Sequence, residues 1–449
     1  MPPSSSIPIF LIRQKEYKSW LKKQPPQWTQ WAAANHFAAT PASWCLLPDE
    51  TGRISAVAVG VGDRIDRWAL AELPGRLPEG NYRLEKEVDG DTADALMLGW
   101  LMGSYRFARY TKQKKLPTLH PPKGCNMRQV HTMSDAITQA RDLINTPAND
   151  MGPQELADAC RRIAEHHAAE YREIVGEALL KENYPAIFEV GKASTRLPRL
   201  IDMRWGDKRH PKVTLVGKGV CFDSGGLDIK SSSGMRLMKK DMGGAACVLA
   251  LARMLMDAKV KIRLRVLIPA VENSIAGNAY RPLDVIRTRK GLNVEIGNTD
   301  AEGRIILCDA LCEADSEKPA LLIDCATLTG GARVAVGTEI AALFTPDDAL
   351  AADMIRHGNT QDDPLWRLPL WEGYRDMLKS PIADINSAPD STYASAITAA
   401  LYLKEFVCET KAWAHIDMMA WNLKARPGRP IGGEAMAARA LFSYIIDRF

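Results

Sequence analysis

The second half of the sequence alternates between short β-rich runs and helical patterns, and this order limits the folds open to the chain. The predicted strands are residues 212–216, 262–269, 321–324 and 412–417, and the predicted helices are residues 243–257, 304–315, 396–407 and 432–449. Strands that alternate with helices form a mostly parallel sheet with helices on both faces. The sequence therefore predicts an α/β fold, in which ligands bind at the carboxyl ends of the strands.

The length of 449 residues indicates more than one domain. A predicted strand at residues 54–61 and a predicted helix at residues 91–106 indicate a small α/β domain in the first part of the chain. Residues 106–128 contain seven Lys or Arg and no acidic residue, which is typical of an exposed basic connector. Two predicted helices, at residues 134–143 and 153–167, follow it. We expect an N-terminal α/β domain with this connector over residues 1–130, and a larger catalytic domain with a mostly parallel central sheet over residues 131–449.

Composition excludes several classes of protein. With 46% hydrophobic and 25% charged residues, the chain is typical of a globular protein, and its formal charge of +4 gives no general case for a nucleic-acid partner. No window approaches the roughly 18 apolar residues of a membrane span, and the first residues lack a signal-peptide pattern. The nine cysteines form no CxxC pair. We therefore expect a cytoplasmic protein with no membrane partner.

Two polar stretches follow apolar runs and are expected to form one site. The first, VEIGNTDAEGRIIL at residues 294–307, places Asp300, Glu302 and Arg304 between apolar residues, and buried charges of this density need compensation. The second, residues 217–246, contains the charged residues Lys218, Asp223, Lys230 and Asp241. No HExxH motif occurs, so any metal would be held mainly by carboxylates.

The carboxylates of these stretches favour a pair of divalent ions. Four carboxylates that converge without cations would repel one another, whereas two divalent ions neutralise them. Two such ions generate a hydroxide nucleophile and polarise a carbonyl or phosphoryl oxygen, which indicates hydrolysis. On an extended segment, Asp300 and Glu302 would point to one side. The plainer alternative for Asp241 is that it caps the helix predicted to follow it.

The basic residues of the two stretches have two interpretations each. Lys218 could bind a metal if it loses its proton, and Lys230 could stay charged and stabilise an oxyanion. The alternative for either lysine is an ordinary salt bridge to a carboxylate of the site. Arg304 could hold a small anion, and its alternative is packing at the start of its helix or pairing with Glu302.

Three motifs in order give the chain a family resemblance: GKGVCFDSGGLDIK at residues 217–230, KKDMGGAA at 239–246 and NTDAEGR at 298–304. With NTPAN at 145–149 and TLTG at 327–330, the chain from about residue 130 to the end resembles the bacterial branch of the leucyl aminopeptidase (cytosol aminopeptidase, M17) family. The resemblance implies a metal-dependent aminopeptidase that hydrolyses the N-terminal peptide bond of peptides through a metal-bridging hydroxide.

The resemblance also implies roles for individual residues. The ligands of the looser metal would be Asp223, Asp300 and Glu302, and those of the tighter metal Lys218, Asp223, Asp241 and Glu302. The ions would be Mn²⁺ or Zn²⁺, with Mg²⁺ and Co²⁺ as alternatives, and the free α-amine of the peptide would bind the tighter one. The catalytic residues would be Lys230, beside the oxyanion, and Arg304, which would hold a bicarbonate that acts as general base.

By the same resemblance, the first side chain of the substrate would bind in a pocket formed by Met238, Asn298, Thr327, Leu328 and Gly330. The segment after His415 would complete this pocket. Here the sequence departs from the animal and plant enzymes, because Met419, Trp421 and Asn422 replace a more aliphatic run, and Asn422 is expected to bring a polar group to the edge of the pocket. Family members are typically homohexamers.

Two other functions are weighed against the aminopeptidase. The basic residues 106–128 are the sequence support for a DNA-binding architectural or regulatory role, which would show steep salt dependence. Dinuclear sites also hydrolyse phosphoesters. That third reading ranks last, because the chain lacks the histidine ligands usual there and any GxxxxGK[ST] loop.

Overall fold

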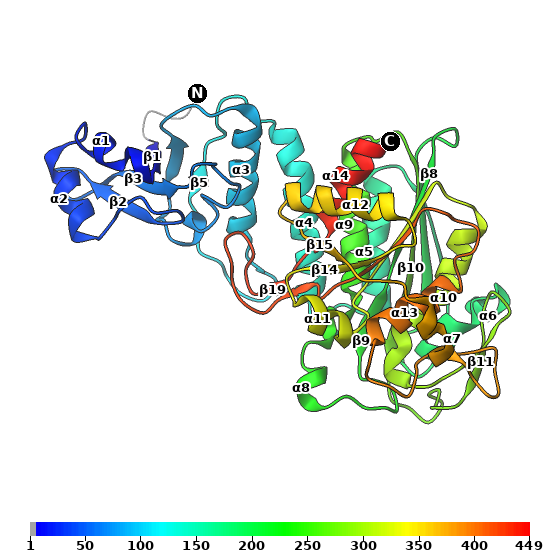
Figure 1. Cartoon of the computed structure of the whole chain (residues 1–449). Coiled ribbons are helices and arrows are strands. Elements are labelled where there is room, and N and C mark those ends of the chain that lie inside the picture. Colours follow the sequence, from blue (N-terminus) through cyan, green and yellow to red (C-terminus); the bar gives the residue numbers. More distant parts are fainter. Residues whose placement is uncertain (1–5) are drawn as a thin grey trace. The chain divides into compact units, whose positions relative to one another are not determined.

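The computed structural model describes residues 6–449, which form two compact units (Figure 1). The first unit comprises the chain up to Thr138 together with Lys424–Ile431, and the second comprises Gln139–Leu423 and Gly432–Phe449. Within residues 6–449, no helix has both the length and the apolar character needed to cross a membrane.

The first unit is a small α/β domain, as predicted. Its five-stranded sheet has the order β2-β3-β1-β4-β5, and all neighbours are parallel except β2 and β3. The strands are β1 (Ile7–Arg13), β2 (Trp44–Pro48), β3 (Ile54–Val61), β4 (Asn81–Leu84) and β5 (Thr118–Leu119), and the helices are α1 (Tyr17–Leu21), α2 (Pro26–Ala34) and α3 (Gly90–Ser104). The short strand β5 lies within the predicted basic connector, so part of that segment belongs to the sheet.

The second unit contains a nine-stranded, mostly parallel sheet, which confirms the predicted fold class. Its order is β15-β14-β17-β13-β8-β10-β7-β6, and β9 pairs with the end of β10. The strands are β6 (Glu170–Val175), β7 (Arg199–Trp205), β8 (Lys212–Gly217), β9 (Gly219–Asp223), β10 (Arg263–Asn273), β13 (Leu321–Ala326), β14 (Ala341–Phe344), β15 (Leu365–Arg367) and β17 (Trp413–Asp417). The antiparallel pairs are β7 with β10, β6 with β7, and β14 with β17.

Helices pack on this sheet because its strands are apolar on both sides. The longer helices are α4 (Met127–Asn145), α5 (Pro153–His166), α7 (Pro185–Gly191), α9 (Gly243–Asp257), α10 (Glu302–Ser316), α11 (Gly330–Val336), α12 (Asp348–Thr360), α13 (Ser395–Lys404) and α14 (Ala438–Arg448). Alternate strand residues, such as Val216, Leu267 and Leu322, share a buried cluster with Ile305 and Ile306 of α10. Smaller sheets are formed by β11 (Val285–Arg287), β12 (Asn293–Glu295) and β16 (Ile385–Asn386), and by β18 (Trp421–Asn422) and β19 (Gly432–Gly433).

The predicted closing helix over residues 432–449 is wrong at its start. Gly432 and Gly433 form β19, and α14 begins only at Ala438. The reason is a distant cap: the carboxylate of Asp363 accepts hydrogen bonds from the backbone N–H groups of Ala437, Arg439 and Ala440. Because this cap comes from another part of the chain, no local pattern marks it.

Candidate metal centre and active site

A cavity of about 800 Å³ lies where the polar loops of the second unit converge. The predicted metal ligands, catalytic residues and first-side-chain pocket residues line it, namely Lys218, Asp223, Lys230, Met238, Asp241, Asn298, Asp300, Glu302, Arg304, Thr327, Leu328 and Gly330, whereas Met419, Trp421 and Asn422 of the segment after His415 do not. The loops after β9 and β13 and the start of α10 contribute most of these residues. Their convergence agrees with the expectation that ligands bind at the carboxyl ends of parallel strands.

Lys218 lies between β8 and β9 and is almost fully buried. Its Nζ is 2.7 Å from Asp241 Oδ2 and 2.8 Å from Glu302 Oε1, and it donates a hydrogen bond to the carbonyl of Thr327. Burial alone would lower the pKa of Lys218, but the neighbouring carboxylates outweigh it and hold the pKa above its ordinary value. A Cβ at Gly303 would come within 2.6 Å of Lys218 Cε, so glycine is needed there to make room for this lysine.

Lys230 joins the carboxylates on the other side of the cavity. Its Nζ lies 2.7 Å from Asp223 Oδ2 and also pairs with Asp300. Asp223 is held in place through its other oxygen, which accepts hydrogen bonds from the backbone of Gly225 and the side chain of Asn273, each at 2.9 Å. Gly225 has a φ of +89°, a conformation that favours glycine, and this turn directs the chain back toward Lys230.

Asp300 and Glu302 do not lie on an extended segment, so that prediction is wrong. Asn298 accepts a hydrogen bond from the backbone N–H of Asp300 and starts a short 3₁₀ helix, η4 (Thr299–Ala301), which leads directly into α10. Even so, oxygen atoms of Asp223, Asp300 and Glu302 all lie within 4.8 Å of one another. Burial, with a contribution from Asp223, raises the pKa of Asp300 to about 6 and that of Glu302 to about 8.

The carboxylates of the cavity converge on two lysines and leave one buried oxygen without a partner. Asp241 Oδ2, Asp300 Oδ1 and Glu302 Oε1 are paired with lysine nitrogens, whereas Glu302 Oε2 is buried and has no partner among the described residues. Leaving buried acceptors unsatisfied costs free energy. Carboxylate oxygens are preferred ligands of divalent cations, and two such cations would neutralise these carboxylates. The donor set therefore fits divalent metal ions.

Asp241 does not cap the following helix, so the plainer alternative for this residue is wrong. The residue before α9 is Met242, and no side chain caps this helix. Asp241 instead lies in the 3₁₀ helix η3 (Met238–Met242), and its Oδ1 accepts a hydrogen bond of 2.7 Å from the hydroxyl of Thr327. This contact orients the Asp241 carboxylate toward Lys218.

Arg304 lies in the first turn of α10 and is buried. Its Nη1 donates a hydrogen bond of 2.6 Å to the carbonyl of Ser387, and its Nε has no partner. Burial lowers the pKa of Arg304. Glu302 lies in the same turn, but the two side chains form no ion pair within residues 6–449.

Two residues that position the site, Asn273 and Asp417, were not identified from the sequence. Asn273 ends β10, which continues four residues past the predicted end at Pro269, and it binds both Asp223 and the carbonyl of Thr299. Asp417 accepts hydrogen bonds from the backbone N–H of Leu328 and from the backbone and hydroxyl of Thr329. Asn273 and Asp417 could have been found by the same feature of the sequence, because each is a polar residue at the carboxyl end of a strand.

The segment after His415 differs from its expected role. Asn422 does not line the cavity; it is buried, and its Nδ2 donates a hydrogen bond of 2.7 Å to Glu434 Oε2. Glu434 in turn forms an ion pair of 3.0 Å with Arg141. The polar amide of Asn422 therefore satisfies a buried carboxylate and is absent from the pocket edge.

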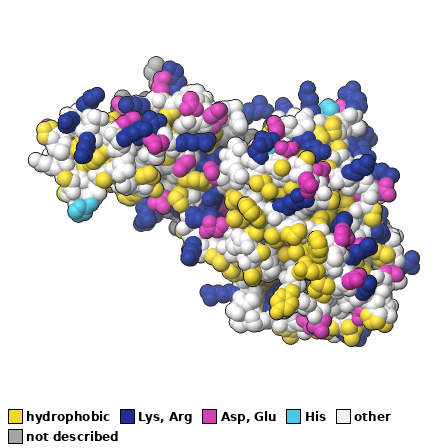
Figure 2. Space-filling model, viewed as in Figure 1, with side chains coloured by type: hydrophobic (Ala, Val, Ile, Leu, Met, Phe, Trp, Pro, Cys, Tyr) yellow, Lys and Arg dark blue, Asp and Glu magenta, His cyan; other side chains and the backbone are white. Residues whose placement is uncertain are grey.

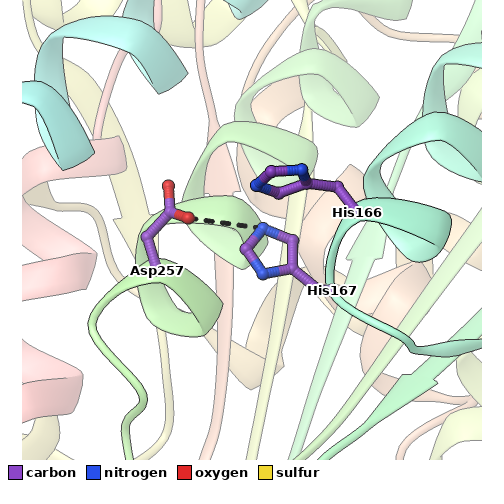
Figure 3. A group of neighbouring side chains, drawn as sticks. All are labelled: His166, His167 and Asp257. Atoms are coloured by element: carbon purple, nitrogen blue, oxygen red, sulfur yellow. Dashed lines mark ion pairs between the residues drawn. The ribbon is translucent and has the colours of Figure 1, made fainter.

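A second group of metal-capable side chains lies outside this cavity. Figure 3 shows His166 and His167, at the end of α5, facing Asp257 at the end of α9, with His167 Nε2 3.4 Å from Asp257 Oδ1. The other oxygen of Asp257 is 3.6 Å from Arg253 Nε. Because this fixed positive charge competes with a cation for the carboxylate, we assign the group no metal.

The chain matches two family models in succession. Residues 138–442 match the catalytic domain of the cytosol aminopeptidase family, and residues 7–119 match the N-terminal domain of M17 aminopeptidases. The fold and the carboxylate-lysine cavity thus define a metallo-exopeptidase. The chain belongs to the cytosol aminopeptidase (M17) family, and it is an aminopeptidase of the leucyl aminopeptidase type.

Individual relatives agree with this assignment. The chain is 40% identical to a probable cytosol aminopeptidase of Geobacter sp. (strain M21) over 78% of this chain and 75% of that protein. The crystal structure of cytosol aminopeptidase from Coxiella burnetii matches with a TM-score of 0.96 and 47% identity, covering 100% of this chain and 98% of that one. The bottromycin maturation enzyme BotP in complex with Mn matches with a TM-score of 0.89 and 30% identity, covering 99% and 100%.

Proposed function

We propose that this cavity removes N-terminal residues from peptides by means of two divalent ions. The ions would be held by Lys218, Asp223, Asp241, Asp300 and Glu302, with Asp223 and Glu302 shared between them. The convergence of carboxylate oxygens of Asp223, Asp300 and Glu302 within 4.8 Å of one another carries this proposal. Mn²⁺ is our first candidate, since one similar structure is a complex with Mn. When bound, such ions lower the pKa of water and polarise the scissile carbonyl.

The residues around the ions would orient the peptide. The free α-amine would lie beside Asp241, whose carboxylate Thr327 holds in place. Met238, Leu328 and Gly330 would border the first side chain, and Asn298 lines the same cavity. An anchor for the free α-amine would explain why only the first residue is removed.

Two cationic side chains would serve the reaction itself. Burial alone would lower the pKa of Lys230, but the neighbouring carboxylates hold it above the ordinary value, so Lys230 would place a positive charge beside the oxygen that becomes negative in the transition state. Arg304 lines the cavity and would hold a small anion such as bicarbonate, which would accept a proton from the attacking water.

We further propose that residues 131–449 act as the catalytic domain, residues 1–130 as a separate N-terminal domain, and the protein as a homohexamer. Figure 2 shows hydrophobic side chains gathered on the visible face of the second unit. The exposed large hydrophobic residues of that unit include Val334, Trp366 and Trp371. Apolar surface of this kind is typical of protein interfaces. Light scattering coupled to size-exclusion chromatography would test the assembly.

Hydrolysis of Leu-Gly by chelator-stripped protein, as Mn²⁺ is added back, tests the central proposal, with acetyl-Leu-Gly as the matched substrate. We expect metal-dependent release of leucine from the free peptide and none from the acetylated one. Equal cleavage of both peptides would contradict the proposed binding of the free α-amine. No cleavage of either, with Mn²⁺ binding shown by calorimetry, would refute the peptide substrate.

The DNA-binding alternative rests on the basic stretch at residues 106–128. Two of its lysines are paired with acidic residues: Lys115 with Glu79 at 3.5 Å and Lys123 with Glu87 at 3.0 Å. DNA binding stays a hypothesis of the sequence alone, and a gel shift at two salt concentrations would test it.

A further inference from the structure

The loop that joins β13 to α11, residues 327–329, lines the cavity along its whole length. Its first residue, Thr327, is held by the proposed metal ligands. The hydroxyl of Thr327 donates a hydrogen bond of 2.7 Å to Asp241 Oδ1, and its carbonyl accepts one of 3.0 Å from Lys218 Nζ. The position of Thr327 is therefore tied to the groups that would hold the ions.

The next two residues of the loop are held by a different side chain, that of Asp417 at the end of β17. Its Oδ1 accepts hydrogen bonds of 3.0 Å from the backbone N–H of Leu328 and 3.2 Å from that of Thr329. Its Oδ2 accepts a hydrogen bond of 2.6 Å from the hydroxyl of Thr329. This hydroxyl also accepts a hydrogen bond of 3.0 Å from the backbone N–H of Ala332, in the first turn of α11. Asp417 thus fixes both the loop and the start of the helix that follows it.

Asp417 itself belongs neither to the proposed metal ligands nor to the wall of the cavity. It is 1% exposed and forms no ion pair within residues 6–449. The parallel pairing of β13 with β17 places it opposite Ala326, the last residue of β13. Hydrogen bonds to a charged acceptor are stronger than those between neutral groups. The buried carboxylate and the loop that donates to it therefore stabilise each other.

Two separate groups thus hold the two ends of this loop. The proposed function places the first side chain of the peptide beside Leu328 and Gly330, and the ions beside Asp241. We propose that Asp417 is a positioning residue for peptide binding, which acts by holding Leu328 and Gly330 in place. Thr327, by contrast, serves metal binding. Loss of the Asp417 carboxylate should therefore weaken the binding of the peptide and leave the binding of the ions intact.

This inference rests on the proposed function and names the group that fixes its peptide-binding wall. Asp417→Asn keeps the shape of the side chain. In either orientation, however, the amide NH₂ group faces the backbone N–H of Thr329, because that N–H lies near both carboxylate oxygens. Two donors repel each other, so the loop must move. Since a displacement of about 1 Å can cost about 100-fold in a catalysed reaction, we expect KM for Leu-Gly to rise about 10- to 100-fold.

The test measures KM and kcat for Leu-Gly, inhibition by leucine, and Mn²⁺ binding by calorimetry, all in the full chain. KM and the inhibition constant of leucine should rise together in Asp417→Asn, because leucine carries the amine and side chain of the first residue. The fold increase in KM should exceed the fold decrease in kcat. The dissociation constant of Mn²⁺ should stay that of the wild type. Thr327→Val is the reciprocal variant and should lose Mn²⁺ affinity instead.

Asp315→Asn is the matched control for the loss of a buried carboxylate. Asp315 lies in α10, is buried and does not line the cavity. Its carboxylate accepts hydrogen bonds from the backbone N–H groups of Cys408, Glu409 and Thr410. The control should lower the melting temperature and leave KM unchanged. If it raises KM as much as Asp417→Asn does, the effect is a general loss of stability and the inference is wrong.

An unchanged KM in folded Asp417→Asn would overturn the inference. An equal loss of Mn²⁺ affinity would also overturn it, because the loop would then move as one unit. If Asp417→Asn does not fold, Thr329→Val and Thr329→Ser take its place. Thr329→Val should raise KM, and Thr329→Ser, which keeps the hydroxyl, should recover most of the wild-type value; an unchanged KM in Thr329→Val refutes the inference.

The wild type separates this inference from the proposed function. Cleavage of Leu-Gly by the wild type, with a KM that the variants leave unchanged, refutes this inference alone. No cleavage by the Mn²⁺-loaded wild type refutes the proposed function and the inference with it.

Discussion

Lys218 and Asp241 form a buried ion pair, with 2.7 Å between Nζ and Oδ2, at the centre of the cavity. Glu302 Oε1 lies 2.8 Å from the same nitrogen. The positive charge of Lys218 thus occupies the place where divalent ions would neutralise these carboxylates. For Lys218 to become a metal ligand, its proton must leave, and the second positive charge of the incoming ion favours this loss.

The first prediction concerns Lys218. In Lys218→Met, chelator-stripped protein retains two buried carboxylates that have lost their nearest cation, which costs about 3 to 5 kcal/mol in comparable buried pairs. The melting temperature in chelator should fall well below that of the wild type, and added Mn²⁺ should recover a large part of the difference. Differential scanning fluorimetry with and without Mn²⁺ measures both. A loss of stability that is equal in the two conditions would show that Lys218 acts only through packing.

The second prediction concerns Glu302. Its replacement in Glu302→Gln keeps the shape of the side chain and removes the charge that would hold the ions. Turnover of Leu-Gly should fall more than about 10³-fold, because metal-assisted hydrolysis supplies several kcal/mol of transition-state stabilisation. The circular dichroism spectrum should stay that of the wild type. Glu177→Gln, at an exposed position, is the control and should keep full activity; retained activity in Glu302→Gln would rule out the two-metal assignment.

The third prediction concerns Thr327, which donates a hydrogen bond of 2.7 Å to Asp241 Oδ1. Loss of a hydrogen bond to a metal-binding carboxylate typically weakens metal affinity about 10- to 100-fold. Thr327→Val should therefore raise the Mn²⁺ concentration needed for half-maximal activity by this factor. Thr327→Ser, which keeps the hydroxyl, should restore most of the affinity. If Thr327→Val keeps the wild-type affinity, the hydrogen bond does not support metal binding and this prediction is wrong.

The fourth prediction concerns the pH dependence of stability. His415 is fully buried, and its Nδ1 lies 2.5 Å from Asp324 Oδ1. Burial alone would lower the pKa of His415, but the Asp324 carboxylate outweighs it and raises the pKa above the ordinary value of 6.5. The protonated imidazole therefore stabilises the fold below about pH 6.5, and this contribution is lost as the pH rises through the raised pKa.

Urea unfolding of the wild type and of His415→Gln at several pH values between 6 and 9 tests this relationship. The wild type should lose stability relative to the variant as the pH rises. His210→Gln replaces a histidine that is not part of a buried ion pair and serves as control. Curves that run parallel for wild type and His415→Gln would contradict the proposed charge on His415.

Much of the central sheet could be predicted, because it depends on local apolar runs. Helix α9 spans Gly243–Asp257 as expected, since two glycines precede a long apolar stretch. The geometry of Asp300 and Glu302 could not be predicted in the same way. Asn298 and the start of α10 convert a segment that resembles a strand into a 3₁₀ turn, and this local hydrogen bond competes with the extended form. The predicted position of Asn422 was wrong because its side chain binds Glu434, which forms an ion pair with Arg141 of α4. The sequence gives no local sign of these contacts.

The sequence by itself determined which groups this protein can use: carboxylates and lysines in ordered motifs, whose charges demand cations and whose order is that of the cytosol aminopeptidase family. Only the tertiary structure decided how these groups are paired. It places Lys218 between Asp241 and Glu302, and Lys230 between Asp223 and Asp300. The physical reason is that ion pairing falls off steeply with distance in a poorly screened interior, and these distances depend on contacts between segments far apart in the chain.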